Sequence, residues 1–423
     1  MLVLALVGAA CGTSTNNSSA TTTTKAATVP SSAANGASPG ITSSQVTLGN
    51  VSILSGPVPG LFQGAPDGVK AFFNYVNTTQ GGVYGRKLVL RSADDQFSCT
   101  TNQSLTQSLV SQVFAFVGSF SLFDNCGAAV LRQNPQVPDV AYSLDPVAQA
   151  LPNNFSPQPL QNGWRTGPLL YYKKHYPSAV RAVGTLVSNV PSSVASWNNE
   201  KAAMRSLGYN IVYDQTINPL TTDFSPYIAA MQQAGVKLLT LTNVDITRLA
   251  LILNAAQQQG WHPMVLSAGG TAYDARLFTL THPGAAEGLL NDQQQALYLP
   301  VPDSDASTTP EVKLFDEWMA KTNPGFSPDI FSVFAWASAR LFVQALQAAG
   351  PNPTQASVMA ALRNIHSFDS NGLLAPGDPA DKKAPHCWVL IKVIGHKFVR
   401  YDSPATGFRC DGSYFQNTSS SGG

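Results

Sequence analysis

The chain carries little charge of either sign. Its 423 residues include 25 lysines and arginines and 24 aspartates and glutamates, so the formal net charge is +1 and charged residues make up 12%. A nucleic-acid-binding protein needs a basic face, and this composition argues against one. Hydrophobic residues make up 44%, which is enough for packed cores. The length exceeds that of one ordinary domain.

Motifs of the common enzyme classes are also missing. The six histidines are scattered, and none belongs to an H-E-x-x-H pattern or accompanies a nucleophile. There is no Walker A loop, so any ATP hydrolysis would belong to a partner. No Cys/His cluster has the spacing of a metal site, so we expect neither metal nor cofactor. A G-x-S-x-G match at residues 36–40 lies in a Ser/Thr-rich segment and does not indicate a hydrolase.

No long hydrophobic run could span a bilayer at the start of the chain, because residues 1–10 are far fewer than the roughly 20 that a span needs. This apolar run is typical of a secretory signal, and Cys11 follows it as in a lipobox, whose cysteine is lipidated. The alternative is an ordinary cleaved signal. Gly8 departs from the lipobox pattern, and no Lys or Arg precedes the run, which suggests a start further upstream.

Residues 12–44 are dominated by Thr, Ser, Ala and Asn, with Lys25 as the one charge. Such a segment cannot bury enough apolar surface to offset the entropy of ordering it. We therefore expect a disordered tether that joins a lipid anchor at Cys11 to a folded, exported protein. It would place the protein at the extracytoplasmic face of the cell membrane or in the periplasm.

The cysteines support an oxidising compartment. Apart from Cys11 there are four, Cys99, Cys126, Cys387 and Cys410, which allow three pairings. Proximity in sequence favours Cys99–Cys126 and Cys387–Cys410. Four free thiols would be unusual in an exported protein.

Strand and helix patterns alternate twice along the chain. Residues 87–93 and 114–117 are typical of strands, and the helical pattern of 100–112 between them completes a βαβ unit. A similar alternation runs from 181 to 266, beyond a Pro-, Asn- and Gln-rich stretch at 151–163. The fold class is therefore α/β, with two lobes that each contain a doubly wound, mostly parallel sheet.

The boundaries follow from these patterns. Residues 164–176 are expected to form a helix, 288–300 to return toward the first lobe, and 387–394 with 397–401 to form a hairpin that closes the second lobe. The chain would cross between the lobes three times. We assign 45–155 and 297–384 to the first lobe, 156–296 and 385–412 to the second, and 413–423 to a disordered tail.

The runs GGVYGRKLVLRSADDQFSC (81–99) and FVGSFS (116–121) resemble the first lobe of class I solute-binding proteins of ABC importers. The most similar branch binds branched-chain amino acids (Leu/Ile/Val), and the resemblance extends from Gln45 to Tyr401. It implies a two-lobed periplasmic-binding-protein-like receptor, expected to be a monomer, that closes around a small molecule and is recognised by ABC permease subunits. It also suggests the Cys99–Cys126 pairing.

Ligands of open α/β sheets bind beyond the carboxyl ends of the strands. The candidate contacts are therefore the residues that follow strand ends, although each could equally be a solvated loop residue. Those of the first lobe are Ser55, Ser119, Phe120, Ser121, Tyr142 and Ser143. Those of the second lobe are Ser188, Asn189, Asn243, Asp245, Gly269 and Tyr273.

The family's amino-acid contacts are not conserved in type here. Branched-chain amino acid binders hold the zwitterion with Ser and Thr in the first lobe and an acidic residue in the second. Those positions fall near Leu122, Asp145 and Ala268. Asp245 could replace the acid, but it follows a different strand. We expect a small polar or amphipathic ligand, such as an amino acid, an amide or a related compound.

Two alternatives to an importer subunit remain open at this point. One is a sensor of the same fold that passes closure to a signalling partner. The other is a secreted hydrolase, for which no nucleophile and base are apparent. Asp94 and Asp95 could mimic a catalytic carboxylate pair, but neighbours in a strand exit point apart. We expect them to cap the following helix instead.

Overall fold

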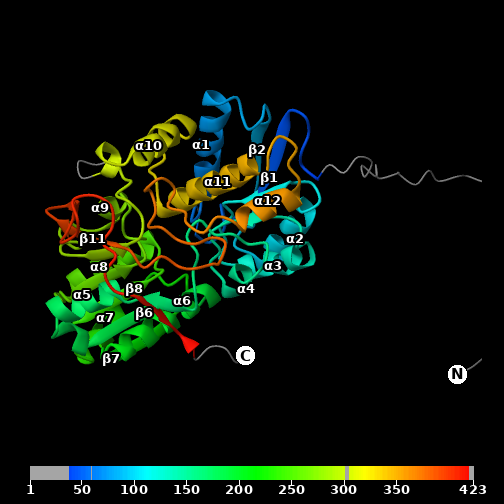
Figure 1. The fold of residues 1–423 in the computed structure, drawn as a ribbon. Coiled ribbons are helices and arrows are strands. Elements are labelled where there is room, and N and C mark those ends of the chain that lie inside the picture. The colour runs from blue at the N-terminus through cyan, green and yellow to red at the C-terminus, as the bar shows by residue number, and fades with distance from the viewer. Residues whose placement is uncertain (1–37, 59, 301–303, 419–423) are drawn as a thin grey trace, which may run out of the picture. The chain divides into compact units, whose positions relative to one another are not determined.

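The computed structural model describes residues 38–58, 60–300 and 304–418. The expected signal sequence, Cys11 and most of the expected tether lie outside them. Residues Ser38–Gly423 belong to one compact unit. Its strands form a four-stranded sheet, a seven-stranded sheet and a two-stranded ribbon (Figure 1). We call the part built on the four-stranded sheet lobe 1 and the part built on the seven-stranded sheet lobe 2.

Lobe 1 has a parallel sheet in the order β2-β1-β3-β4. The strands are β1 (Gln45–Ser52), β2 (Lys87–Asp94), β3 (Ala115–Val117) and β4 (Asp139–Val140), and the helices that follow them are α1 (Gly64–Thr79), α2 (Cys99–Leu109), α3 (Asp124–Gln133) and α4 (Pro146–Gln149). Three later helices, α10 (Pro310–Thr322), α11 (Ile330–Ala348) and α12 (Gln355–Leu362), return to this lobe, where α10 and α11 pack on α1.

Lobe 2 has its strands in the order β12-β11-β10-β9-β8-β6-β7. The parallel strands are β6 (Val183–Ser188), β7 (Ile211–Ile217), β8 (Leu238–Thr242), β9 (Met264–Ala268) and β10 (Leu290–Gln293). The helices are α5 (Gly167–His175), α6 (Pro191–Ser206), α7 (Ser225–Gln233), α8 (Ile246–Gln258) and α9 (Leu277–Leu280). The predicted hairpin is confirmed as β11 (Val389–Ile394) and β12 (Lys397–Arg400), joined antiparallel to β10.

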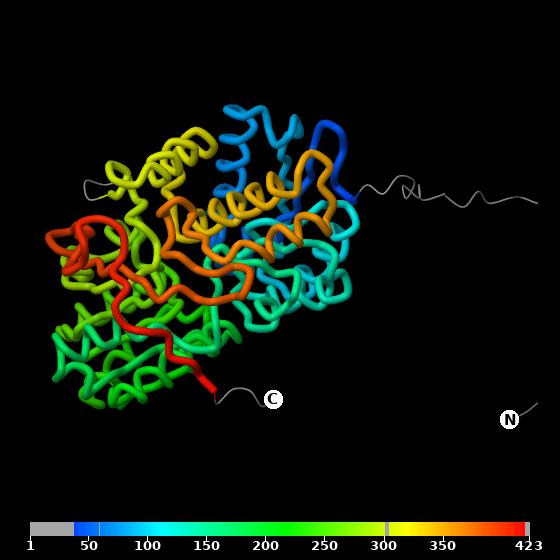
Figure 2. Tube along the Cα trace, in the orientation of Figure 1, coloured from blue at the N-terminus to red at the C-terminus, as the bar shows by residue number. Residues whose placement is uncertain are grey.

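The order of the elements confirms two doubly wound lobes and three crossings between them. Figure 2 follows the chain from lobe 1 (blue and cyan) into lobe 2 (green), back to α10–α12 (yellow and orange) and again to lobe 2 (red). In both sheets, loops follow the carboxyl ends of the parallel strands. These are the loops at which the sequence predicts the ligand-binding site.

Two boundary predictions are wrong because the structure pairs segments that are distant in sequence. Residues 164–176 do not form one helix: β5 (Gly163–Arg165) precedes α5, which begins only at Gly167 and Pro168. The partner of β5 is β13 (Tyr414–Gln416), in the predicted disordered tail. Ladder hydrogen bonds to β13 hold residues 163–165 extended, and proline suits the first turn of the helix that follows.

Two further boundaries move. Residues 288–300 contain β10, so this segment completes the parallel part of the lobe 2 sheet before it returns to lobe 1. The ordered chain begins before Gln45: the Gly40 carbonyl accepts the Thr47 N–H at 2.7 Å. A Cβ at Gly40, whose φ is +72°, would lie 2.2 Å from the backbone nitrogen of Phe114, so only glycine allows this approach.

One helix among the described residues, α11, is long and apolar enough to cross a membrane. Within the protein, 78% of that stretch is buried, as expected of a core helix. Asp329 caps its start: the Asp329 side chain accepts the Ser332 N–H at 2.8 Å, and the Ser332 side chain in turn accepts the Asp329 N–H. The capped end of α11 therefore has a fixed position beside the loops of lobe 2.

A buried ion pair fixes the first crossing between the lobes. Arg165 of β5 donates to Asp292 of β10, and the two side chains are 7% and 2% exposed. The Tyr172 hydroxyl donates to the other oxygen of Asp292 at 3.2 Å. Breaking such a pair leaves an uncompensated buried charge, which is costly.

We therefore expect Asp292→Ala to lower the free energy of unfolding by roughly 3–5 kcal/mol. Urea denaturation followed by circular dichroism would measure this. Glu317→Ala, which breaks the exposed pair with Lys321, serves as the control and should leave the midpoint nearly unchanged. Equal effects of the two substitutions would contradict a structural role for the buried pair.

Candidate functional site

A pocket with a cavity volume of about 90 Å³ lies between the strand-end loops of the two lobes and opens to solvent. The two sides differ in chemistry, because lobe 1 contributes mainly apolar side chains and lobe 2 mainly polar ones. The pocket is therefore suited to a ligand with one apolar and one polar part.

The lobe 1 side comes from the loops after all four strands and from the first turn of α11. We call these side chains the apolar wall. It consists of Val58, Leu61 and Phe62 after β1, Phe97 after β2, Leu122 after β3, Leu144 after β4, and Phe331 of α11. The loops are those predicted, but the side chains are not.

The predicted serines of lobe 1 are turned away from this pocket. Ser119 accepts the Val51 N–H at 3.2 Å, and the buried Ser121 donates to Asp95. Ser143 accepts from the Asn154 side chain at 3.0 Å. All three line a separate cavity of about 40 Å³ inside lobe 1. Ser55 is exposed and donates to Asp94, outside the pocket lining.

The predicted aromatic residues of lobe 1 support the apolar wall from behind. Phe120 is 1% exposed and packs on Phe62 and Phe331, with ring centroids 5.5 and 5.3 Å apart. Tyr142 stacks on Phe334 at 3.9 Å, and burial raises the pKa of its hydroxyl. Neither lines the pocket, but both fix the side chains that do.

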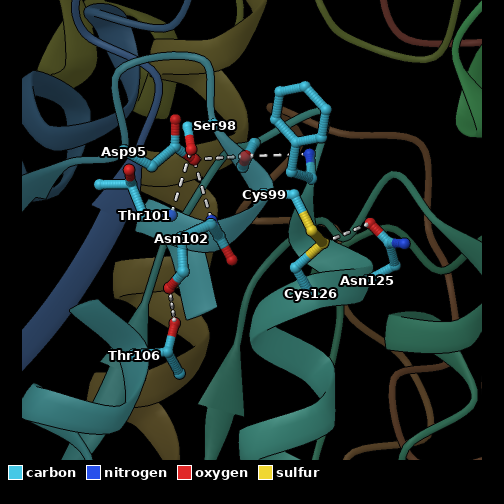
Figure 3. Close-up of a disulfide and its surroundings, with 10 residues drawn as sticks. Asp95, Ser98, Cys99, Thr101, Asn102, Thr106, Asn125 and Cys126 are labelled. Carbon is cyan, nitrogen blue, oxygen red and sulfur yellow. Dashed lines mark hydrogen bonds between the residues drawn. A yellow bond between two sulfur atoms is a disulfide. The ribbon is translucent and has the colours of Figure 1, made fainter. Parts of the chain in front are cut away.

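Asp94 and Asp95 point apart, as predicted, but neither caps α2. Asp94 accepts the N–H groups of Leu54 and Ser55 at 2.9 and 3.2 Å. Partial burial raises the pKa of Asp94, but these hydrogen bonds and the one from the Ser55 hydroxyl outweigh it, so the pKa is lowered overall. Burial raises the pKa of Asp95, against its bonds to Ser121 and Asn102. The cap of α2 is Ser98, which accepts the Thr101 N–H at 3.2 Å (Figure 3).

Both predicted disulfides are present. Cys99 in the first turn of α2 bonds Cys126 in the first turn of α3, and Cys387 bonds Cys410 (Figure 3 shows the former). The first bridge joins the loop that carries Phe97 to the loop that carries Leu122. It therefore fixes two parts of the apolar wall relative to each other.

The lobe 2 side is largely polar. Three predicted residues, Ser188, Asn243 and Asp245, line the pocket. Residues that the sequence reasoning missed complete this side: Val190, Ser192, Ser193, Pro219, Arg248 and Thr271. Ser192, Ser193 and Arg248 lie in the first turns of α6 and α8, Val190 is the N-cap of α6, and Pro219 and Thr271 lie in the loops after β7 and β9. A helix position three residues after a loop residue was a usable signal, because residues three apart lie on the same face of a helix.

The other predicted residues of lobe 2 lie outside the lining. Asn189 is exposed, and Gly269 lies with φ +97° behind Asn243. Tyr273 is fully buried against Tyr298 and Phe398, with centroids 5.1 and 4.9 Å away. Apolar packing, rather than ligand contact, explains the position of this tyrosine.

Asp245 caps α8. One carboxylate oxygen accepts the N–H groups of Thr247 and Arg248 at 3.1 and 3.2 Å. The other accepts from Arg248 Nη1 at 2.9 Å. Both oxygens are thus occupied within the protein.

In the part of the chain that the structure describes, one group of side chains has the geometry of a metal site. His366, Asp378 and Asp381 bring possible ligand atoms within 4.8 Å of one another. The Lys383 ammonium already pairs with both aspartates, at 3.4 and 2.6 Å. This group lies outside the pocket, and its internal cation accounts for the gathering of the carboxylates.

A two-lobed α/β protein with a pocket between its strand-end loops has many known counterparts. The sequence model described as periplasmic binding protein matches residues 45–397, so this chain belongs to that family. A curated relative is Leu/Ile/Val-binding protein homolog 1 of Brucella suis. It is 24% identical over 333 residues, which cover 75% of this chain and 82% of the relative. The predicted resemblance to this type of binding protein is confirmed.

Solved structures confirm the fold. A fatty acid ABC transporter substrate-binding protein from Thermomonospora curvata has a TM-score of 0.72 at 18% identity, covering 90% of this chain and 95% of its own. A branched chain amino acid ABC transporter protein from Thermus thermophilus with bound valine has 0.70 at 20% identity, covering 86% and 96%. A solute binding protein from R. palustris in complex with 4-hydroxybenzoate has 0.69 at 19% identity, covering 84% and 95%.

The Cys99–Cys126 bridge leads to a prediction about the apolar wall. The double variant Cys99→Ser/Cys126→Ser should lose about 3–4 kcal/mol of stability, since a 27-residue separation is no longer closed. Amide hydrogen exchange under native conditions should rise in the loops at 94–98 and 121–124.

Cys387→Ser/Cys410→Ser is the matched control, because it opens a similar separation of 23 residues in lobe 2. It should lower stability comparably and leave exchange in the two lobe 1 loops unchanged. If both double variants increased exchange there equally, the bridge would not be what fixes the wall.

Proposed function

We propose that this protein is the extracytoplasmic substrate-binding subunit of an ABC importer. It binds a small molecule between its lobes and delivers the closed complex to membrane permease subunits. The observation that supports this most is the pocket that the strand-end loops of both lobes line together. A ligand that touches both lobes favours closure through its differential affinity for the closed state.

The solved relatives support this role by their ligands and partners. All three are ABC transporter proteins, and their ligands are valine, 4-hydroxybenzoate and, for one, fatty acid. Similar folds therefore bind ligands that range from an amino acid to amphipathic acids. The family's fold leaves the ligand of this chain open.

Local structure favours an amphipathic ligand over a branched-chain amino acid. Leu122, at the family's serine position, belongs to the apolar wall. Asp145 is buried and caps α4 by accepting the Val147 N–H at 2.8 Å. Ala268, at the acidic position, is 1% exposed at the end of β9. None of the three offers the contacts that would hold a zwitterion.

The cellular setting is part of the proposal. The two disulfides fit an oxidising compartment outside the cytoplasm. Lipidation of Cys11 would hold the protein at the outer face of the membrane, where a monomer on a tether reaches its permease. The relatives are binding proteins, and this fits the sequence analysis, in which no catalytic nucleophile and base are apparent.

The test is a thermal unfolding screen of the purified full-length protein. The panel contains amino acids, amides, urea, short-chain and aromatic acids, polyols and sugars. A ligand at 100 times its dissociation constant should add about 2.7 kcal/mol. Small-angle scattering with the same ligand should show a smaller radius of gyration, because the lobes close.

Leu61→Asp places a charge in the apolar wall and should abolish the ligand-induced shift. Leu170→Asp is the matched control, since Leu170 is 43% exposed on α5 and outside the pocket lining. The absence of any shift in the screen would contradict the proposed function. A full shift retained by Leu61→Asp would place the ligand outside this pocket.

A further inference from the structure

The N-terminus of α6 opens on the polar side of the pocket. Its N-cap is Val190, which provides no side-chain hydrogen bond, and Pro191 follows without an N–H. Ser192 and Ser193, the next two residues, line the pocket. The first N–H groups of a helix have no partner within it and carry a partial positive charge. This end of a 16-residue helix therefore favours an anion.

A buried arginine lines the same side. Arg248 is only 8% exposed, and its Nη1 donates to Asp245 at 2.9 Å. Its Nε is buried and has no hydrogen-bond partner among the residues that the structure describes. A buried donor without a partner is costly, and an acceptor on a ligand would remove that cost. Guanidinium groups are especially suited to carboxylates.

A ligand ammonium group finds no comparable partner in this lining. Asp245 is the one acidic residue among the pocket-lining residues, and its oxygens accept from two N–H groups and from Arg248. The remaining polar side chains of the lining are uncharged: Ser188, Ser192, Ser193, Asn243 and Thr271. Apart from the Asp245–Arg248 pair, this lining, taken over the described residues, therefore contains no second carboxylate that could pair with an ammonium group.

The acids of the neighbouring pocket are also occupied. This pocket, with a cavity volume of about 40 Å³, shares Asp245 and Thr271 with the first. Its Asp274 pairs with Arg276 at 2.5 Å. Its Asp329 caps α11, and burial raises the pKa of this carboxyl to about 7. An ammonium group that shifted toward this side would therefore also lack a free carboxylate.

We propose, on the basis of the proposed function, that the ligand is an amphipathic carboxylic acid that needs no α-ammonium group. Its carboxylate is held in lobe 2 by Arg248 and the N-terminal amides of α6. Its apolar part lies against the apolar wall of lobe 1. The acid is a straight-chain or aromatic one, whose apolar part can lie along this wall.

Titration calorimetry of the full-length protein tests this with matched pairs of ligands. Hexanoate, octanoate, benzoate and phenylacetate are compared with their primary amides and with leucine and valine. We expect at least one acid to bind, with its amide at least tenfold weaker, because the amide carries no charge for Arg248. This comparison uses the unchanged protein and does not depend on a variant folding.

Two substitutions assign the contact. Arg248→Gln should weaken the acid at least tenfold and leave the amide within about twofold, since only the anion gains from the guanidinium charge. Arg205→Gln removes the same charge from an exposed site near the end of α6 and should change neither. Asp245→Asn keeps a capping oxygen but removes the charge that competes for Arg248, so affinity for the acid should rise severalfold.

The outcomes separate this inference from the proposed function. Binding of leucine, valine or an amide in preference to every acid would overturn the carboxylate site while leaving a substrate-binding protein. Loss of binding in Asp245→Asn would show that Asp245 holds an ammonium group, with the same consequence. Equal affinity of an acid for Arg248→Gln and the unchanged protein would overturn the role of Arg248. No binding by any compound of the broad screen would overturn both proposals.

Discussion

The polar groups buried beneath the lobe 1 strand ends determine which side chains reach the cleft. Asp95 is fully buried and accepts from Asn102, Ser121 and the Phe97 N–H. Asn50 donates to the carbonyls of Val117 and Gly118 at the end of β3. Because buried polar groups must be paired, the small polar residues directly after these strands point inward. Apolar side chains such as Leu122 and Leu144 are left to face the pocket.

The fold could be read from the sequence where local pattern decides it. Alternating strand and helix patterns gave both lobes, and a cysteine spacing of fewer than 30 residues gave both bridges. The errors at residues 164–176 and 413–418 have one cause. The β5–β13 ribbon joins segments about 250 residues apart, and no local periodicity indicates such a pairing. Cross-strand partners, not propensity, made these residues extended.

The candidate site was predictable to a different extent in the two lobes. In lobe 2, the expectation that the residues after strand ends line the pocket holds for Ser188, Asn243 and Asp245, because α6 and α8 follow their strands closely. Arg248 was missed because it lies in the first turn of α8 and not in the loop before it, although its spacing from Asp245 places both on one helix face. In lobe 1 the predicted loops line the pocket, but with other residues than the predicted ones. Which side of a loop faces solvent depends on buried hydrogen bonds that the sequence does not display.

The division of the pocket into an apolar and a polar side bears on how closure would be driven. Polar contacts lie almost wholly in lobe 2, so an anionic ligand gains most of its hydrogen bonds before the lobes meet. What closure then adds is burial against the apolar wall, at about 25 cal/mol per Å² of apolar surface removed from water. The charged group would set which ligands enter, and the size of the apolar part would set how far the equilibrium shifts to the closed state. A disulfide-fixed wall favours this arrangement, because a wall that is ordered beforehand loses little entropy when the ligand reaches it.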